Sequence, residues 1–162
     1  MDLAQKDLQS GGPSKDNIVP ILYRPFDIRF TYYTGRSRGF QCMPRGEVMQ
    51  HMIAGMNIGL IASKQTRDHW NVYASRHIIG HKAVAAYDIN SMFPLYIYPD
   101  DAPRDSLLDG ACKSDHCVTN LAAAFITDFT ARLGLTFIPK GKGDRIKTFG
   151  PEDVFDYMYA VF

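Results

Sequence analysis

Residues 18–34 constrain the fold of this chain more than any other segment. β-Branched and aromatic side chains dominate the segment, and such side chains favour extended strands over helices. Pro20 and Pro25 lack a backbone N–H, so we expect each of them to break the extended structure. The ordered part of the chain therefore begins with β-structure.

Helical and extended segments alternate irregularly after this point. Residues 44–56 favour a helix, because Val48, Met52 and Met56 recur at helical spacing. Pro94 indicates an edge position or a strand start. Further strands are expected at residues 57–63, 71–77, 83–87, 93–98 and 135–138. This order predicts an α+β fold, with a mixed or antiparallel sheet and flanking helices in a single domain.

Two helices are expected in the last third of the chain. Asn120 can cap a helix over residues 121–133, which Gly134 ends. Pro151 suits the first turn of the second helix, and the two acids that follow it favour the positive end of the helix dipole. No stop signal follows this second helix, so we expect a piece of a longer protein, truncated within a C-terminal helix.

Composition and charge leave the binding partner open. The chain has 162 residues, with 18 Lys and Arg against 17 Asp and Glu, and a net charge of +1. Only a local cluster of basic residues could therefore attract nucleic acid. The apolar runs are too short to cross a bilayer, and the N-terminus has no signal-peptide core. Three cysteines, an odd number, argue against a disulfide framework and predict a cytoplasmic protein.

Motifs for catalysis or metal binding are missing from the sequence or incomplete. Enzymes that methylate amino groups on DNA usually carry an Asn/Asp-Pro-Pro-aromatic tetrapeptide, and this chain has no Pro-Pro. Residues 141–143 (GKG) are too short for a nucleotide-binding loop. Residues 112–117 hold two cysteines, an aspartate and a histidine, but the second ligand pair of a zinc site is missing. Asp100 and Asp101 lack the Glu-x-Lys partner of a common nuclease centre. We predict no catalytic residue, metal site or cofactor in this chain.

Three basic loops are candidates for contact with DNA. Arginine, lysine and glutamine hold phosphates or base edges, and Trp70 could stack on a base. The opposing interpretation is that these are solvated loop charges and that Trp70 belongs to the core. The candidate DNA-binding residues are Arg36, Arg38, Arg45, Lys64, Gln65, Arg67, Lys140, Lys142 and Arg145.

Residues 18–29 (IVPILYRPFDIR) resemble an element of one protein family, the Type ISP restriction-modification enzymes. Similar blocks follow in the same order at residues 44–49 (PRGEVM), 57–61 (NIGLI), 93–99 (FPLYIYP) and 149–160 (FGPEDVFDYMYA). These enzymes join a nuclease, a helicase-like motor, an adenine-N6 methyltransferase and a C-terminal specificity region in one chain. The resemblance is to that last region. It implies a partial target-recognition domain at residues 17–162, behind a flexible lead-in at residues 1–16.

The resemblance also implies that the chain recognises DNA and has no active site of its own. Its partners would be double-stranded DNA and the methyltransferase domain of the parent protein, which would bind S-adenosylmethionine, ATP and Mg²⁺ elsewhere. The alternative is a structural piece that docks between domains without touching DNA. Large aromatic anchors and charges that pair with one another suit such an interdomain brace. Its candidate residues are Tyr23, Arg24, Phe26, Asp27 and Arg29.

Overall fold

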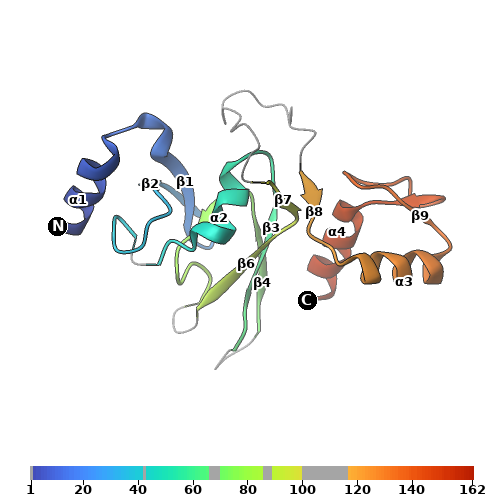
Figure 1. Ribbon diagram of the computed structural model, residues 1–162. Coiled ribbons are helices and arrows are strands. Elements are labelled where there is room, and N and C mark those ends of the chain that lie inside the picture. Colours follow the sequence, from blue (N-terminus) through green and yellow to red (C-terminus); the bar gives the residue numbers. More distant parts are fainter. Residues whose placement is uncertain (1, 42, 66–69, 86–88, 100–116) are drawn as a thin grey trace.

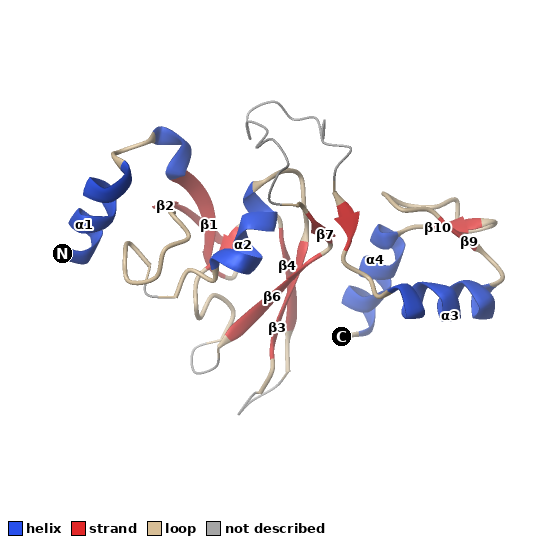
Figure 2. Ribbon diagram, viewed as in Figure 1, coloured by secondary structure: helices blue, strands red, loops and turns tan. Residues whose placement is uncertain are grey.

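The computed structural model describes residues 2–41, 43–65, 70–85, 89–99 and 117–162, which form the predicted α+β fold (Figures 1 and 2). The helices are α1 (Asp2–Gly11), the 3-10 helix η1 (Lys15–Asn17), α2 (Gly46–Ile53), α3 (Ala123–Leu133) and α4 (Pro151–Val161). The strands are β1 (Ile18–Arg24), β2 (Asp27–Tyr32), β3 (Gly59–Ser63), β4 (Val72–Ser75), β5 (Ile78–Ile79), β6 (Asn90–Pro94), β7 (Tyr96–Ile97), β8 (Val118–Thr119), β9 (Thr136–Phe137) and β10 (Thr148–Phe149). None of the helices described is long and apolar enough to span a bilayer.

β1 is the central strand of the first sheet, whose order is β2-β1-β5. It pairs antiparallel along β2, and parallel with β5 at Ile21 and Leu22. The expectation that Pro20 breaks the strand is wrong. β5 reaches only Ile21 and Leu22, so no second strand lies beside Pro20 among the described residues to need its missing N–H. Pro25 does end β1, because it lies in the turn to β2.

β3 is the central strand of the second sheet, whose order is β4-β3-β6. All residues of β3 are buried, because both faces of this sheet are covered. Successive side chains point to opposite faces, so Ile61 belongs to the core beside α2, whereas Leu60 packs with Phe155 of α4. β6 is an edge strand that ends at Pro94, which confirms the edge position predicted for that proline.

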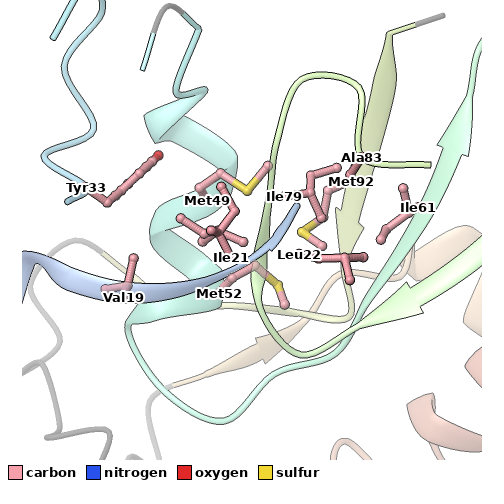
Figure 3. Packing of buried hydrophobic residues seen from close by; sticks show 11 residues of the cluster. Val19, Ile21, Leu22, Tyr33, Met49, Met52, Ile61, Ile79, Ala83 and Met92 are labelled. Carbon is pink, nitrogen blue, oxygen red and sulfur yellow. The ribbon is translucent and has the colours of Figure 1, made fainter. Parts of the chain in front are cut away.

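The main core lies where the two three-stranded sheets meet α2 (Figure 3). Its buried side chains come from five elements and two connecting segments: Val19, Ile21, Leu22, Tyr33, Met49, Met52, Ile61, Ile78, Ile79, Ala83 and Met92. Burying these apolar groups against one another holds the two sheets and α2 together. The loops at the ends of the second sheet therefore start from a rigid base.

The C-terminal elements α3, β9, β10 and α4 lie together at one end of the molecule (Figure 1). β9 and β10 pair in parallel, and Phe129 of α3 meets Phe149 of β10 edge-on, with ring centroids 5.5 Å apart. Gly134 adopts a left-handed backbone (φ 67°) at the end of α3, and Pro151 begins α4, as the sequence predicts. α4 joins this end of the molecule to the second sheet through Phe155.

Two further local predictions are wrong. Asn120 caps no helix: α3 begins at Ala123, and Asn120 Nδ2 donates to the Pro94 carbonyl at 2.9 Å. Residues 83–85 form no strand, and the rest of the predicted strand at 86–87 lies outside the described residues. β5, β8 and β10 were not predicted, because strands of two residues carry no periodic signal and exist through their pairing partners.

Candidate nucleic-acid interface

The loop after β2 carries two candidate contact residues and is held against α1. Arg36 Nη1 donates a hydrogen bond to Ser10 Oγ of α1. The buried carboxylate of Asp7, also on α1, accepts from Thr34 Oγ1 at 2.8 Å. Arg38 is exposed, with a left-handed backbone (φ 62°), and its side chain has no hydrogen bond or ion pair among the described residues. Helix α1 therefore fixes the loop while Arg38 faces solvent.

Arg45 lies at the start of α2 and turns its guanidinium toward the fold. Its Nη1 donates to the backbone carbonyl of Asn90, and its Nε and Nη2 are buried without a partner in the part of the chain described. Burial lowers the pKa of the guanidinium from its ordinary value, against the opposing effect of Glu47. Arg45 thus connects α2 to β6, and its contact with DNA remains a prediction.

Asn90 stabilises the end of β3 through hydrogen bonds, and Lys64 and Gln65 follow directly after this end. The Asn90 side chain is completely buried; its Nδ2 donates to Ser63 Oγ at 3.0 Å, and its Oδ1 accepts from the Val84 N–H at 2.9 Å. Lys64 and Gln65 are exposed directly after Ser63. A buried amide network therefore presents these two candidates at one end of the second sheet.

Trp70 lies beside the same end of β3. It is held by contacts within the chain but remains 43% exposed. Its Nε1 donates to the Ser63 carbonyl at 2.8 Å, and its ring meets Phe162 edge-on with centroids 4.9 Å apart. With Lys64 it lines a mainly apolar pocket of about 700 Å³ between the second sheet and α4. Stacking of Trp70 on a base remains a prediction, and Arg67 lies outside the described residues.

Asp144 shapes the basic loop between β9 and β10. Its Oδ1 accepts from the backbone N–H groups of Lys147, Ile146 and Thr148 at 2.8 to 3.0 Å. These hydrogen bonds hold the pKa of Asp144 well below its ordinary value. The carboxylate therefore stays ionised at neutral pH and keeps the loop closed on itself.

Asp153 joins this loop to α4. Its Oδ2 accepts from the N–H groups of Gly143 at 2.6 Å and Gly150 at 3.0 Å, and its Oδ1 accepts from Arg145 Nε at 2.8 Å. Burial opposes ionisation of Asp153, but these hydrogen bonds outweigh it and lower the pKa. Arg145 therefore has a structural partner, which the sequence does not reveal.

Lys142 lies at a small cleft that also holds a residue missed by the sequence analysis. Lys142 Nζ is 2.6 Å from Asp156 Oδ2. Arg76, in the turn between β4 and β5, and Lys140 line the same cleft of about 350 Å³. Arg76 is exposed, with no hydrogen bond or ion pair among the described residues. The prediction of one strand over residues 71–77 concealed the turn that presents it.

The hairpin of β1 and β2 carries the proposed brace residues, of which Arg29 and Asp27 form an ion pair, whereas Arg24 Nη1 donates to the Lys82 carbonyl at 2.8 Å. Arg29 Nη2 is 2.9 Å from Asp27 Oδ2. The guanidinium groups of Arg29 and Arg24 lie 4.2 and 4.8 Å from the centroid of the Tyr23 ring. Phe26 occupies the turn with a left-handed backbone (φ 63°) and is 95% exposed. The turn end of the hairpin is thus largely exposed, whereas the middle of β1 belongs to the core.

Within the described part of the chain, no three His, Cys, Asp or Glu side chains are grouped so that they could hold a metal ion. Cys117 is buried in the apolar cluster that contains Phe155. The acids at 100 and 101 and the cysteine, aspartate and histidine at 112, 115 and 116 lie outside the described residues.

Comparisons with known proteins relate the chain to one solved structure and to one protein family. The chain is similar to one chain of the cryo-EM structure of a DrdV–DNA complex, with a TM-score of 0.65 and 20% sequence identity, over 96% of this chain and 13% of that one. At this identity the likeness shows a common fold, and the chain spans only a small part of that protein's length. No curated protein matches the chain. A family model described as the Type ISP C-terminal specificity domain matches residues 2–162. This match covers nearly the whole sequence, so the chain belongs to the family of Type ISP C-terminal specificity domains.

Proposed function

We propose that this chain is the DNA target-recognition module of a restriction-modification enzyme and that it positions duplex DNA for an adenine methyltransferase in another part of the same protein. The family match over residues 2–162 carries the proposal. The similarity to a chain from a DrdV–DNA complex supports it. Under this proposal, S-adenosylmethionine, ATP and Mg²⁺ belong to the other domains.

The arrangement of basic residues around the second sheet supports the same function. Lys64 and Gln65 follow β3 at one end, and Arg76 follows β4 at the other. A strand rises about 3.3 Å per residue, so the length of β3 separates these places by roughly 15 Å. The major groove of DNA is about 12 Å wide, so phosphates on its two sides are separated by a comparable distance. Gln65 is suited to a base edge, and the cations to phosphates.

The test of this function is the salt dependence of duplex binding. With about four phosphate contacts, the logarithm of the association constant should fall with the logarithm of salt at a slope of about −3.6, so the affinity should fall about 150-fold between 50 and 200 mM. Lys64→Ala should reduce the slope by about 1, because one phosphate contact is lost. Fluorescence anisotropy with a labelled duplex measures both.

Lys15→Ala is the matched control, because Lys15 is an exposed lysine of η1, outside the second sheet. It should leave the slope and the affinity unchanged. Binding that is absent at low salt, or that does not depend on salt, would contradict direct recognition of DNA by this chain.

A second function, docking onto the methyltransferase domain, is favoured by the exposed apolar side of the β1–β2 hairpin. Phe30 is 76% exposed on the edge strand β2, and Ile28 lies two residues away on the same face. Ile18, on the neighbouring β1, and Phe26, at the turn, are exposed as well. A contiguous exposed apolar patch is typical of an interaction site. This interface could act together with DNA recognition or in its place.

Phe30→Asp should weaken binding to a separately produced methyltransferase domain by about 10- to 100-fold, since buried aromatic anchors dominate interfaces. Isothermal titration calorimetry measures this affinity. Ile146→Asp is the control, because Ile146 is 78% exposed on the β9–β10 loop and lies outside the hairpin. Equal losses for the two variants would argue against docking through the hairpin.

A further inference from the structure

We infer that a phosphate group of the DNA backbone binds in the cleft lined by Arg76, Lys140 and Lys142, where it takes the place of the Asp156 carboxylate. We call this place the Arg76 cleft. The inference rests on the proposed function. It adds to that function a phosphate contact and the Asp156 carboxylate, which competes with the phosphate for the same cations.

The Arg76 cleft is small and is built on a fixed backbone. Its volume of about 350 Å³ has room for a phosphate group. Gly141, between the two lysines, donates its N–H to Tyr96 Oη at 3.0 Å and accepts from the Glu152 N–H at 3.2 Å. The side chains of Tyr96 and Phe155 line the cleft.

Asp156 already occupies the cleft as an internal oxyanion. Its Oδ2 lies 2.6 Å from Lys142 Nζ and 3.8 Å from Arg145 Nη2. Phosphate oxygens are bound by the same cations in the same way as carboxylate oxygens. The cleft therefore has the donors that a backbone phosphate needs.

The Asp156 pair can exchange, whereas the neighbouring Asp153 cannot. The side chains of Lys142 and Asp156 are 47% and 50% exposed, and exposed ion pairs contribute little to stability. Asp153 is only 11% exposed and accepts from two backbone N–H groups in addition to Arg145. An incoming phosphate can thus displace Asp156 while Asp153 keeps the loop in place.

Arg76 supplies the charge that Asp156 does not neutralise. Three cations line the cleft, Arg76, Lys140 and Lys142, against two acids, Glu152 and Asp156. Arg76 has neither a hydrogen bond nor an ion pair with another described residue. A phosphate that binds both Arg76 and Lys142 would give Arg76 an ionic partner, whereas in the chain alone its guanidinium faces solvent.

Two variants of the full 162-residue chain test this inference by duplex anisotropy across a salt series. Asp156→Asn should tighten binding about 5-fold at low salt, because Lys142 then has no internal partner to give up. Arg76→Ala should weaken binding about 5- to 10-fold and reduce the slope by about 1. Circular dichroism checks that both variants fold.

The controls separate the cleft from net charge. Asp128→Asn removes an acid from an equivalent surface pair, with Arg132 at 2.8 Å on α3, and Lys15→Ala removes an exposed cation from η1. Neither residue lines the cleft. If Asp128→Asn tightens binding as much as Asp156→Asn, or if Arg76→Ala changes neither affinity nor slope, the inference is overturned.

A second measurement distinguishes DNA from free phosphate. In an NMR titration, the duplex should shift the amide signals of Gly141 and Lys142, and inorganic phosphate should shift the same signals at higher concentration. Shifts caused by inorganic phosphate alone would indicate an adventitious ion only and overturn the assignment to DNA. A wild-type chain that binds no duplex would contradict the proposed function. Phosphate shifts that Arg76→Ala abolishes would still support an oxyanion site here.

Discussion

Replacing Asn57 by alanine is expected to lower the free energy of unfolding by about 3 to 5 kcal/mol, because buried polar groups left without partners cost about 1 to 3 kcal/mol each. The buried Asn57 amide lies in the segment between α2 and β3 and joins this segment to α2 and β7. Its Nδ2 donates to the carbonyls of His51 at 2.9 Å and Tyr96 at 2.8 Å. Its Oδ1 accepts from the N–H groups of Ile58 at 2.9 Å and Tyr96 at 3.1 Å. Alanine removes all four hydrogen bonds and fills none of these positions.

Urea denaturation followed by circular dichroism measures this loss. Gln5→Ala, at an exposed position of α1, is the control and should change stability by less than about 0.5 kcal/mol. Asn57→Asp should be about as damaging as the alanine variant, because it turns a buried carboxylate toward the carbonyls of His51 and Tyr96. A loss below about 1 kcal/mol for Asn57→Ala would contradict the role of this amide in joining α2 to β7.

Asn90→Ala is expected to lower the free energy of unfolding by about 2 to 4 kcal/mol, because it leaves Ser63 Oγ and the Val84 N–H without their partner. Since Asn90 has no exposed surface, water cannot replace the lost amide without rearrangement. The end of β3 should loosen, so the affinity for duplex DNA should fall together with the stability. Thermal unfolding and anisotropy on the same protein measure the two effects.

Asn120→Ala is the matched control for this second prediction. Asn120 is also an asparagine that donates from Nδ2 to a backbone carbonyl, that of Pro94, but it is exposed. Its replacement should cost less than about 1 kcal/mol, since water can replace the lost donor. If Asn90→Ala behaved like Asn120→Ala, the end of β3 would not depend on the buried amide.

Much of the secondary structure could be predicted because its signals are local. The aromatic and β-branched residues of β1 and β2 favour strands, and the spacing of Val48 and Met52 favours the core-facing side of α2. Gly134 and Pro151 mark a helix end and a helix start through their own backbone preferences. The family resemblance also depends on local blocks, and the match over residues 2–162 confirms it.

The candidate site could be predicted only in part, because charge in the sequence does not reveal pairing in space. Lys142 and Arg145 form the densest basic stretch, yet both have acidic partners on α4. Arg45 is basic but directs its guanidinium to Asn90. Arg76 lies in a segment that was predicted to be a strand. In the structure it lies in the turn between β4 and β5, which exposes it beside the loop between β9 and β10.

The sequence by itself determined where the chain prefers to be helical or extended, and which family it resembles, since both depend on neighbouring residues. The tertiary structure decided which residues became partners over long distances. It placed β5 beside β1, allowed Pro20 within a strand, and brought Arg76 to the same cleft as Lys142. Such contacts depend on how the sheets and helices bury their apolar faces against one another, and no local preference encodes that packing.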